Sequence, residues 1–342
     1  MNFISDVLSE KPASRISVFT SVNFSPYENQ KYEDVRIWRF GSVSENSILR
    51  YASYLSYNLF ATISLLMNRP DVVVVYETLS IFPAFVYSSV FKKKKIHVHY
   101  HEYTSISEKL NASRYMKYLF WCEGKLLHKI TCSQTNEDRK ALFLKDNPKV
   151  QSNYVFVFPN LPPANWWSSY GQLKTPRREG KIKLVHVGVL DADTMFLEQI
   201  LLWVQKHPDE LELTIFSQSI SRSAQQLIDK YRSSNIKIKS PIKYYDLPKK
   251  LIQYDIGLVL YNGHIPNYIY NVPNKVYEYI SCGVKVVSVG NLFTLKRTFQ
   301  HDILFLDNSN LDSRSIIDLR HHLSFPSFYS FENTPKLSSL VN

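Results

Sequence analysis

The stretch Asn271-Val-Pro-Asn-Lys-Val-Tyr-Glu-Tyr-Ile-Ser-Cys-Gly-Val-Lys-Val-Val287 decides the fold of this 342-residue chain. The apolar run 255–261 precedes it, and a valine-rich run closes it; both are typical of buried strands. Between the two runs, Pro273 suits a first helical turn and Gly283 suits a left-handed C-terminal cap, which predicts a helix over 273–282. We therefore expect strand, loop, helix and strand, the repeating unit of a parallel α/β sheet.

Lys275 and Glu278 lie three residues apart near the start of the predicted helix and therefore share one side of it. A helix start offers free backbone N–H groups and partial positive charge. In open α/β sheets it lies at the carboxyl ends of the strands, where ligands bind. These properties predict a site for phosphate. Alternatively, the two residues form an exposed helix pair that contributes only about 0.2–0.5 kcal/mol to stability.

The string Pro273-Asn-Lys-Val-Tyr-Glu-Tyr, with the glycine turn that follows, resembles the donor-site signature of glycosyltransferases with the GT-B architecture, particularly the retaining glycosyltransferase family 4. The resemblance implies an α/β fold of two Rossmann-like parallel-sheet domains that face each other across a cleft. It places Lys275 at the phosphates of a nucleotide-sugar donor and Glu278 at the ribose. Relatives often carry a glutamate eight residues before Glu278 that contacts the donor sugar. Here that position is Tyr270, a phenol instead of a carboxylate.

The remaining donor-side residues follow from the same resemblance. Gly188 ends the predicted strand Lys183-Leu-Val-His-Val-Gly188, and relatives continue with an arginine and a Lys-Gly pair. Here the continuation, Val189-Leu-Asp-Ala-Asp-Thr194, has two carboxylates and no base. Lys275 is therefore expected to supply most of the cationic compensation for the diphosphate. Further donor-side residues are Asn271, Pro273 and Asn274 in the signature, and Ser217, Gln218 and Ile242 around the base.

In the N-terminal half, the alternating segment Ile96-His-Val-His-Tyr-His-Glu-Tyr103 predicts a strand that ends at His101 and Glu102. Its three histidines at alternate positions would share one strand face and could hold a metal, but no second ligand cluster lies nearby in the sequence. The segment resembles the His-Asp or His-Glu motif of the same enzymes. This resemblance implies that His101 contacts the transferred sugar and that Glu102 orients it or addresses the acceptor. The alternative is a histidine satisfied within the core.

Two domains are expected from the length and from the restart of the strand pattern at Lys181. The first is an acceptor-side domain over 1–163, followed by a linker over 164–180. The donor-binding domain then covers 181–325, and a crossover tail helix covers 326–342. Relatives usually open with a strand and a glycine-containing loop. The first 163 residues here contain only Gly41 and Gly124, so this strand and loop are either missing or replaced.

Composition limits the classes of function. The net charge of +11 favours phosphate-bearing partners, yet no nucleic-acid-binding signature is visible, and nucleic acid is not expected as a partner. Three cysteines without paired spacing indicate a reducing, cytoplasmic location, and the N-terminus lacks the apolar core of a signal peptide. The uncharged run 51–67 predicts a helix packed on a sheet. A membrane span and an interfacial helix on an anionic cytoplasmic leaflet are the two alternatives.

These patterns together predict a retaining glycosyltransferase that needs no metal and no cofactor besides its nucleotide-sugar co-substrate. The expected acceptor is lipid-linked or a glycan, in cell-surface polysaccharide synthesis of the bacterial type at the inner face of the cytoplasmic membrane. Two alternatives remain open. A catalytically impaired GT-B-like binding or partner protein would explain Tyr270 and the missing basic pair. A nucleotide-sugar epimerase shares the architecture but needs more carboxylates around the sugar.

Overall fold

The computed structural model of the chain describes residues 7, 14–21, 35–40, 47–163, 165–171, 180–290, 292–309 and 311–324. The predicted tail helix 326–342, Gly41 and most of the linker lie outside these residues. The described residues up to Pro159 form one compact unit, and those from Asn160 onwards form a second. The division comes before residue 163 because Leu161 and Trp166 pack into the core of the second unit.

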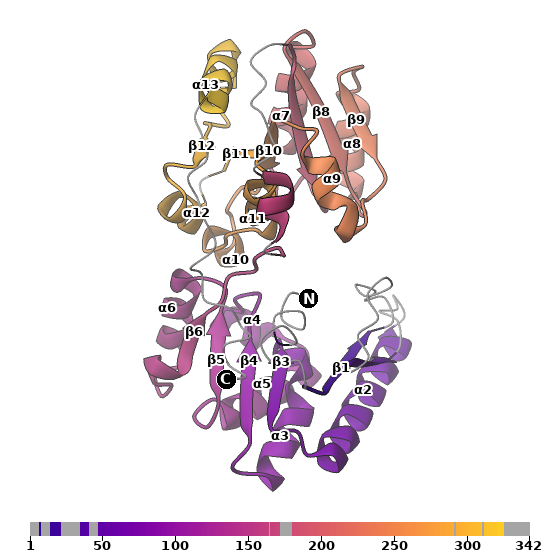
Figure 1. Ribbon diagram of the computed structural model, residues 1–342, viewed down its shortest axis with the longest axis vertical. Helices are drawn as coiled ribbons and strands as arrows, with labels where there is room; N and C mark the ends of the chain where they lie inside the picture. The colour runs from indigo at the N-terminus through magenta and orange to yellow at the C-terminus, as the bar shows by residue number, and fades with distance from the viewer. Residues whose placement is uncertain are drawn as a thin grey trace. The chain divides into compact units, whose positions relative to one another are not determined.

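The first unit is built on a parallel four-stranded sheet with its strands in sequence order (Figure 1). The strands are β3 (Val72–Tyr76), β4 (Lys95–His99), β5 (Thr131–Gln134) and β6 (Val155–Val157). The helices are α2 (Ser47–Asn68), α3 (Ile81–Val90), α4 (Ile106–Asn111), α5 (Arg114–Leu126) and α6 (Glu137–Asp146). A separate parallel pair joins β1 (Ile16–Ser21) to β2 (Val35–Phe40).

The second unit contains a six-stranded parallel sheet in the order β12-β11-β10-β7-β8-β9. Read from the other edge, this is the order of a doubly wound nucleotide-binding sheet, whose switch point falls between β7 and β10. The strands are β7 (Ile182–Val187), β8 (Leu211–Phe216), β9 (Ile236–Lys239), β10 (Ile256–Val259), β11 (Lys285–Ser288) and β12 (Ile303–Phe305). The helices are α7 (Leu197–Lys206), α8 (Arg222–Lys230), α9 (Leu247–Leu251), α10 (Pro266–Ile269), α11 (Asn274–Ser281), α12 (Phe293–Thr298) and α13 (Ser313–Ser324).

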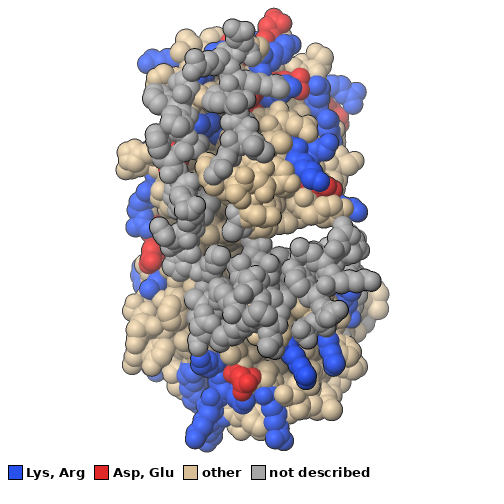
Figure 2. Space-filling view, viewed as in Figure 1, with Lys and Arg blue, Asp and Glu red and all other residues tan. Residues whose placement is uncertain are grey.

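Both faces of this six-stranded sheet are buried. Along β10, Ile256 and Leu258 belong to the core on one face, and Val259 belongs to the core that contains α11 on the other face. All four residues of β10 and all four of β11 are buried, as expected for central strands of a parallel sheet covered on both sides. Figure 2 shows Lys and Arg side chains spread over the surface of both units, in keeping with the net charge of +11.

The helix predicted over 273–282 is confirmed as α11, which begins one residue later because Pro273 takes the N-cap position. Gly283 has φ of 68° and closes the helix as predicted. Its N–H donates to the Ile280 carbonyl at 2.9 Å, and the Val284 N–H donates to the Tyr279 carbonyl at 2.9 Å, the two hydrogen bonds of a Schellman motif. The uncharged run 51–67 is helical within α2, and no described helix is long and apolar enough to cross a membrane.

Tyr279 fixes α11 to both strands of the switch point. Its ring lies directly over Gly257 of β10, where a Cβ atom would come within 2.2 Å of a ring carbon. Its hydroxyl accepts a hydrogen bond from the Val187 N–H of β7 at 3.2 Å. Any side chain at position 257 would displace this ring, so the glycine permits the close approach of helix and sheet.

Candidate functional site

Gly188 and Lys275 lie side by side at the switch point of the second unit. Gly188 follows β7 with φ of 126°, a backbone conformation that residues with a side chain rarely adopt. A Cβ atom at this position would lie 3.4 Å from Lys275 Nζ. The ammonium group of Lys275, on the first turn of α11, therefore faces the bare backbone of the turn after β7.

Lys275 is a buried cation that no carboxylate neutralises at close range. Only 8% of the residue is exposed, and no Asp or Glu of the described chain lies within ion-pair distance of Nζ. Its Nζ lies 5.1 Å from the centre of the Tyr261 ring. Burial lowers the pKa of Lys275 to about 8, although Glu278 acts in the opposite direction. Burying a cation costs free energy, so its retention here points to an anionic ligand.

His186 lies beneath Lys275 in the middle of the sheet and was missed by the sequence analysis. It is fully buried, and its Nε2 lies 3.5 Å from Lys275 Nζ. Nδ1 faces the Leu258 carbonyl at 3.2 Å, which makes Nδ1 the protonated nitrogen and leaves Nε2 as an acceptor toward Lys275. Burial and then the charge of Lys275 hold the pKa of His186 well below its usual range, so the imidazole is neutral.

Glu278 lies one helical turn after Lys275 and is half-buried. Burial raises the pKa of its carboxyl to about 7, and Lys275 opposes this rise. No described residue donates a hydrogen bond to the carboxylate, so its oxygens are available to a ligand. Tyr244 lies in the same region; burial and then the charge of Glu278 raise the pKa of its phenol, and its ring packs against Trp166 at 5.2 Å between centroids.

The other predicted residues of the signature surround the start of α11. Tyr270 ends α10, and its ring meets Phe293 edge-on at 6.0 Å. The Asn271 N–H donates to the Tyr268 carbonyl at 3.2 Å, and Asn274 is exposed at the first position of α11. The Tyr270 side chain therefore packs against an aromatic ring beside the start of α11.

The residues predicted around the base follow β8 and β9. The Ser217 hydroxyl donates to the Ser219 carbonyl at 2.8 Å and accepts from the Ser219 N–H at 3.2 Å, so it holds its own turn. Gln218 is exposed beside it, and Ile242 packs against the core that contains α11. Among these three side chains, Gln218 is the polar group left open to solvent.

In the first unit, His101 and Glu102 follow β4 as predicted, and a half-buried carboxylate that the sequence did not reveal, Glu77, fixes their backbone. Glu77 Oε1 accepts from the His101 N–H at 2.5 Å and from the Glu102 N–H at 3.1 Å. Arg139 Nη1 donates to the His101 carbonyl. The His101 ring stacks on Tyr76 at 5.6 Å, and burial lowers its pKa to about 4, so this imidazole is neutral at pH 7.

Glu77 itself has an unusual conformation and environment. Its φ is 62°, rare for a residue with a side chain, and burial raises the pKa of its carboxyl to about 7. Such backbone conformations cluster at functional sites. Glu77 directly follows β3 at the carboxyl edge of the sheet, which is the one sequence signal that could have identified it.

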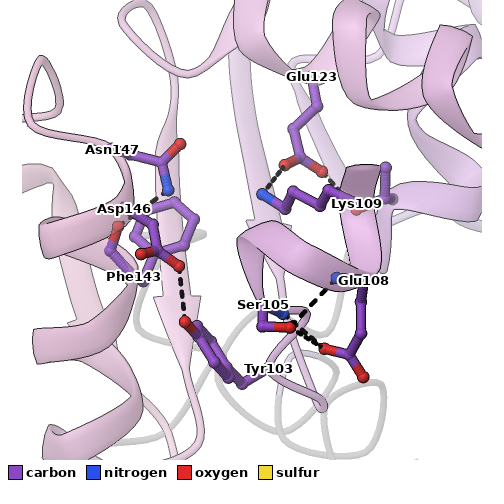
Figure 3. A network of polar contacts seen from close by, with 9 residues as sticks. Tyr103, Ser105, Glu108, Lys109, Glu123, Phe143, Asp146 and Asn147 are labelled. Atoms are coloured by element: carbon purple, nitrogen blue, oxygen red, sulfur yellow. Dashed lines mark hydrogen bonds and ion pairs between the residues drawn. The ribbon is translucent and has the colours of Figure 1, made fainter. Parts of the chain in front are cut away.

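The loop after His101 is held by a polar network (Figure 3). The Tyr103 hydroxyl donates to Asp146 Oδ2 at 2.6 Å. Ser105 and Glu108 form a capping box at the start of α4, and Lys109 pairs with buried Glu123 at 3.6 Å. The segment that presents His101 and Glu102 is therefore anchored to α4, α5 and α6.

The three histidines of β4 and its end do not assemble a metal centre. Ser133 Oγ lies 2.7 Å from His97 Nε2 and 2.8 Å from His99 Nδ1, and Thr131 Oγ1 lies 2.8 Å from His97 Nδ1. Within the described part of the chain, no group of three or more His, Cys, Asp or Glu side chains is arranged to hold a metal ion.

No protein-family profile matches the sequence, and no curated protein matches it. Solved structures do. An alpha,alpha-trehalose-phosphate synthase (UDP-forming) from Burkholderia vietnamiensis is similar with a TM-score of 0.61 at 11% identity, covering 92% of this chain and 91% of that one. The lipopolysaccharide outer core galactosyltransferase WaaB gives 0.58 at 12% identity, covering 99% and 88%. The UDP-GlcNAc 2-epimerase from Methanocaldococcus jannaschii gives 0.53 at 13% identity, covering 90% and 83%.

At these identities the likeness shows the fold. The predicted α/β class is confirmed: the chain has the GT-B fold, with a parallel sheet in each unit. Membership of glycosyltransferase family 4 in particular stays a prediction.

Proposed function

We propose that this protein is a glycosyltransferase that moves a sugar from a nucleotide-sugar donor to a lipid-linked or glycan acceptor. One observation carries the proposal: a buried lysine, paired with no carboxylate of the described chain, faces a glycine turn at the switch point of a doubly wound sheet. One turn further along the same helix is a carboxylate to which no described group donates a hydrogen bond. Open α/β sheets bind nucleotides at such a point, where a helix start meets the phosphates.

In the proposed reaction, Lys275 and the first turn of α11 stabilise the negative charge on the departing nucleoside diphosphate. The bare backbone at Gly188 admits the phosphates, and Glu278 accepts hydrogen bonds from the ribose hydroxyls. Of the two carboxylates after Gly188, Asp191 accepts hydrogen bonds from the Asp193 N–H at 3.3 Å and the Thr194 hydroxyl at 2.9 Å within its own turn, and Asp193 is exposed. The resemblance to family 4 supports retention of configuration without a metal.

His101 and Glu102 are proposed to act from the first unit, His101 on the sugar ring and Glu102 on its orientation or on the acceptor. A neutral imidazole, as burial makes His101, donates and accepts hydrogen bonds with sugar hydroxyls without adding charge. The remaining finer proposals are cell-surface polysaccharide synthesis, action at the cytoplasmic face of the membrane, and the roles of the two units, acceptor-side for the first and donor-binding for the second.

A binding protein without turnover is the second candidate. It is favoured by Tyr270, which packs against Phe293 at the position where family 4 enzymes often carry a glutamate. An epimerase is less well supported, because it would need several carboxylates around the sugar. Among the described residues at the start of α11, Glu278 is the one carboxylate that a sugar nucleotide could reach.

The test is to incubate the protein with a panel of nucleotide sugars, with and without membrane extract, and to analyse both nucleotide and sugar. A transferase releases free nucleotide, an epimerase converts the sugar, and a binding protein does neither. Glu278→Gln and Lys275→Met are expected to abolish release, while Lys249→Met, an exposed lysine of α9, serves as the matched control. Absence of release with every donor, in the presence of extract, would contradict the proposal.

A further inference from the structure

Helices α2 and α5 of the first unit carry exposed apolar and cationic side chains. Along α2, five apolar residues spaced four positions apart are exposed, over about four and a half turns of the helix. Along α5, exposed Tyr118 and Trp121 share the surface with exposed cations. We call the following set the aromatic–basic face: Tyr51, Leu55, Leu59, Ile63, Met67, Tyr118, Trp121, Arg114, Lys117 and Lys125.

The two stripes belong to one continuous layer. Helix α3 packs against both α2 and α5, and Figure 1 shows α2 and α3 side by side. The Tyr115 ring of α5 lies 6.0 Å from that of Tyr51 and 6.2 Å from that of Tyr54, and the Tyr115 hydroxyl accepts from Asn58 Nδ2 at 2.8 Å. The Tyr118 and Trp121 rings stack at 5.9 Å, and Lys125 Nζ lies 5.7 Å from the centre of the Trp121 ring.

Exposed negative charge is missing from these helices. The sequence contains no Asp or Glu between residues 47 and 70 or between residues 78 and 101, and Glu123 of α5 is buried. At the end of α2, Asp71 is paired with Lys94 at 2.6 Å, while Lys92, Lys93 and Lys95 are exposed nearby in the chain. In Figure 2, Lys and Arg side chains gather at the end of the first unit where Figure 1 shows α3 ending.

We propose that the aromatic–basic face docks on an anionic lipid bilayer. Tryptophan and tyrosine favour the boundary between lipid headgroups and acyl chains, and leucine, isoleucine and methionine enter the acyl region from a helix lying in the plane of the surface. Lysine and arginine around them attract anionic headgroups. An apolar surface of this extent is rare on a protein with no binding partner. Because the side chains around it on α2 and α5 include cations and no exposed anions, the partner is expected to be negatively charged.

Vesicle sedimentation with the full chain tests this proposal without any sugar nucleotide, so its outcome is independent of the transferase activity. We expect binding to vesicles of phosphatidylglycerol and phosphatidylcholine, weakening as salt is raised, and little binding to phosphatidylcholine alone. Leu55→Ser with Leu59→Ser should lower the partition coefficient about tenfold or more, and Lys117→Glu with Lys125→Glu should do the same for anionic vesicles only. All four side chains are exposed, so the variants should keep the wild-type melting temperature.

Matched controls lie in the second unit: Ile317→Ser, an exposed isoleucine of α13, and Lys249→Glu with Lys250→Glu on α9. These should bind vesicles like the wild type. The proposal is overturned if the wild type does not sediment with anionic vesicles at low salt. It is equally overturned if the variants of the aromatic–basic face bind these vesicles as well as the controls do. It is also overturned if sedimentation equilibrium shows that the face joins two copies of the chain and that the apolar variant only separates them.

Discussion

Replacing Lys275 with methionine should weaken nucleotide-sugar binding and at the same time stabilise the protein. Methionine keeps the unbranched shape and removes the charge. The ordinary pKa of lysine is 10.5 and that of Lys275 is about 8, because burial disfavours its charged form. At about 1.4 kcal/mol for each pKa unit, this difference corresponds to about 3 kcal/mol by which the buried charge destabilises the folded protein at pH 7.

The sign of this contribution sets its pH dependence. Below pH 8 the lysine is charged in both the folded and the unfolded chain, and the full cost is present. As pH rises from about 8 to 10.5, the folded protein loses the proton first and the cost disappears. Lys275→Met should therefore be more stable than the wild type at pH 7, and the difference should shrink toward pH 10.5.

Binding should change in the opposite direction. Loss of one charge-assisted contact to phosphate costs about 1.5–3 kcal/mol, which weakens affinity about ten- to a hundredfold. Calorimetric titration with the nucleotide sugar that the donor panel selects measures the affinity, and urea unfolding at pH 7 and pH 10 measures the stability. Lys249→Met is the control and should change neither. A Lys275→Met protein that binds as tightly as the wild type, or unfolds more easily at pH 7, would refute this account of the site.

Three further predictions concern neighbouring groups. Because the pKa of Glu278 is about 7 and that of Lys275 about 8, the carboxylate and the ammonium are both charged mainly between these two pH values. Nucleotide-sugar affinity, measured by titrations from pH 6 to pH 9, should therefore peak near pH 7.5. Glu278→Gln should remove the fall in affinity on the acidic side of this peak. His101→Ala should reduce sugar transfer strongly while nucleotide affinity stays unchanged, because His101 belongs to the other unit. Glu77→Ala should produce the same pattern more weakly, since it removes the oxygen that accepts from the His101 and Glu102 N–H groups, and a parallel loss of nucleotide affinity in either variant would contradict this. Gly257→Ala should lower stability by about 1–3 kcal/mol in urea unfolding, since the new Cβ atom would overlap the Tyr279 ring, and an unchanged midpoint would show that the helix can shift away.

The sequence predicted the unit around α11 well because its signals are local. Pro273 and Gly283 set the two ends of the helix, and the apolar runs on each side form β10 and β11. The position of Lys275 on the first turn of this helix followed directly from these boundaries.

The contacts that complete the site could not be read from the sequence, because they join segments far apart. His186 meets Lys275 across 89 positions of the chain, and a histidine inside an apolar strand looks the same whether it fills the core or supports a lysine. Glu77 holds the backbone of His101 from the end of a neighbouring strand, 24 positions earlier. The order of the strands in each sheet brings these pairs together, and this order cannot be derived from the spacing of residue types along the sequence.

The attachment of Tyr279 to both β7 and β10 has a consequence for how a ligand is received. One ring on Gly257 and one hydroxyl on Val187 lock the helix that carries Lys275 and Glu278, so this helix does not have to move to receive a ligand. Binding then costs little ordering entropy in this half of the molecule. Structures of the second unit with and without nucleotide should superimpose closely around α11.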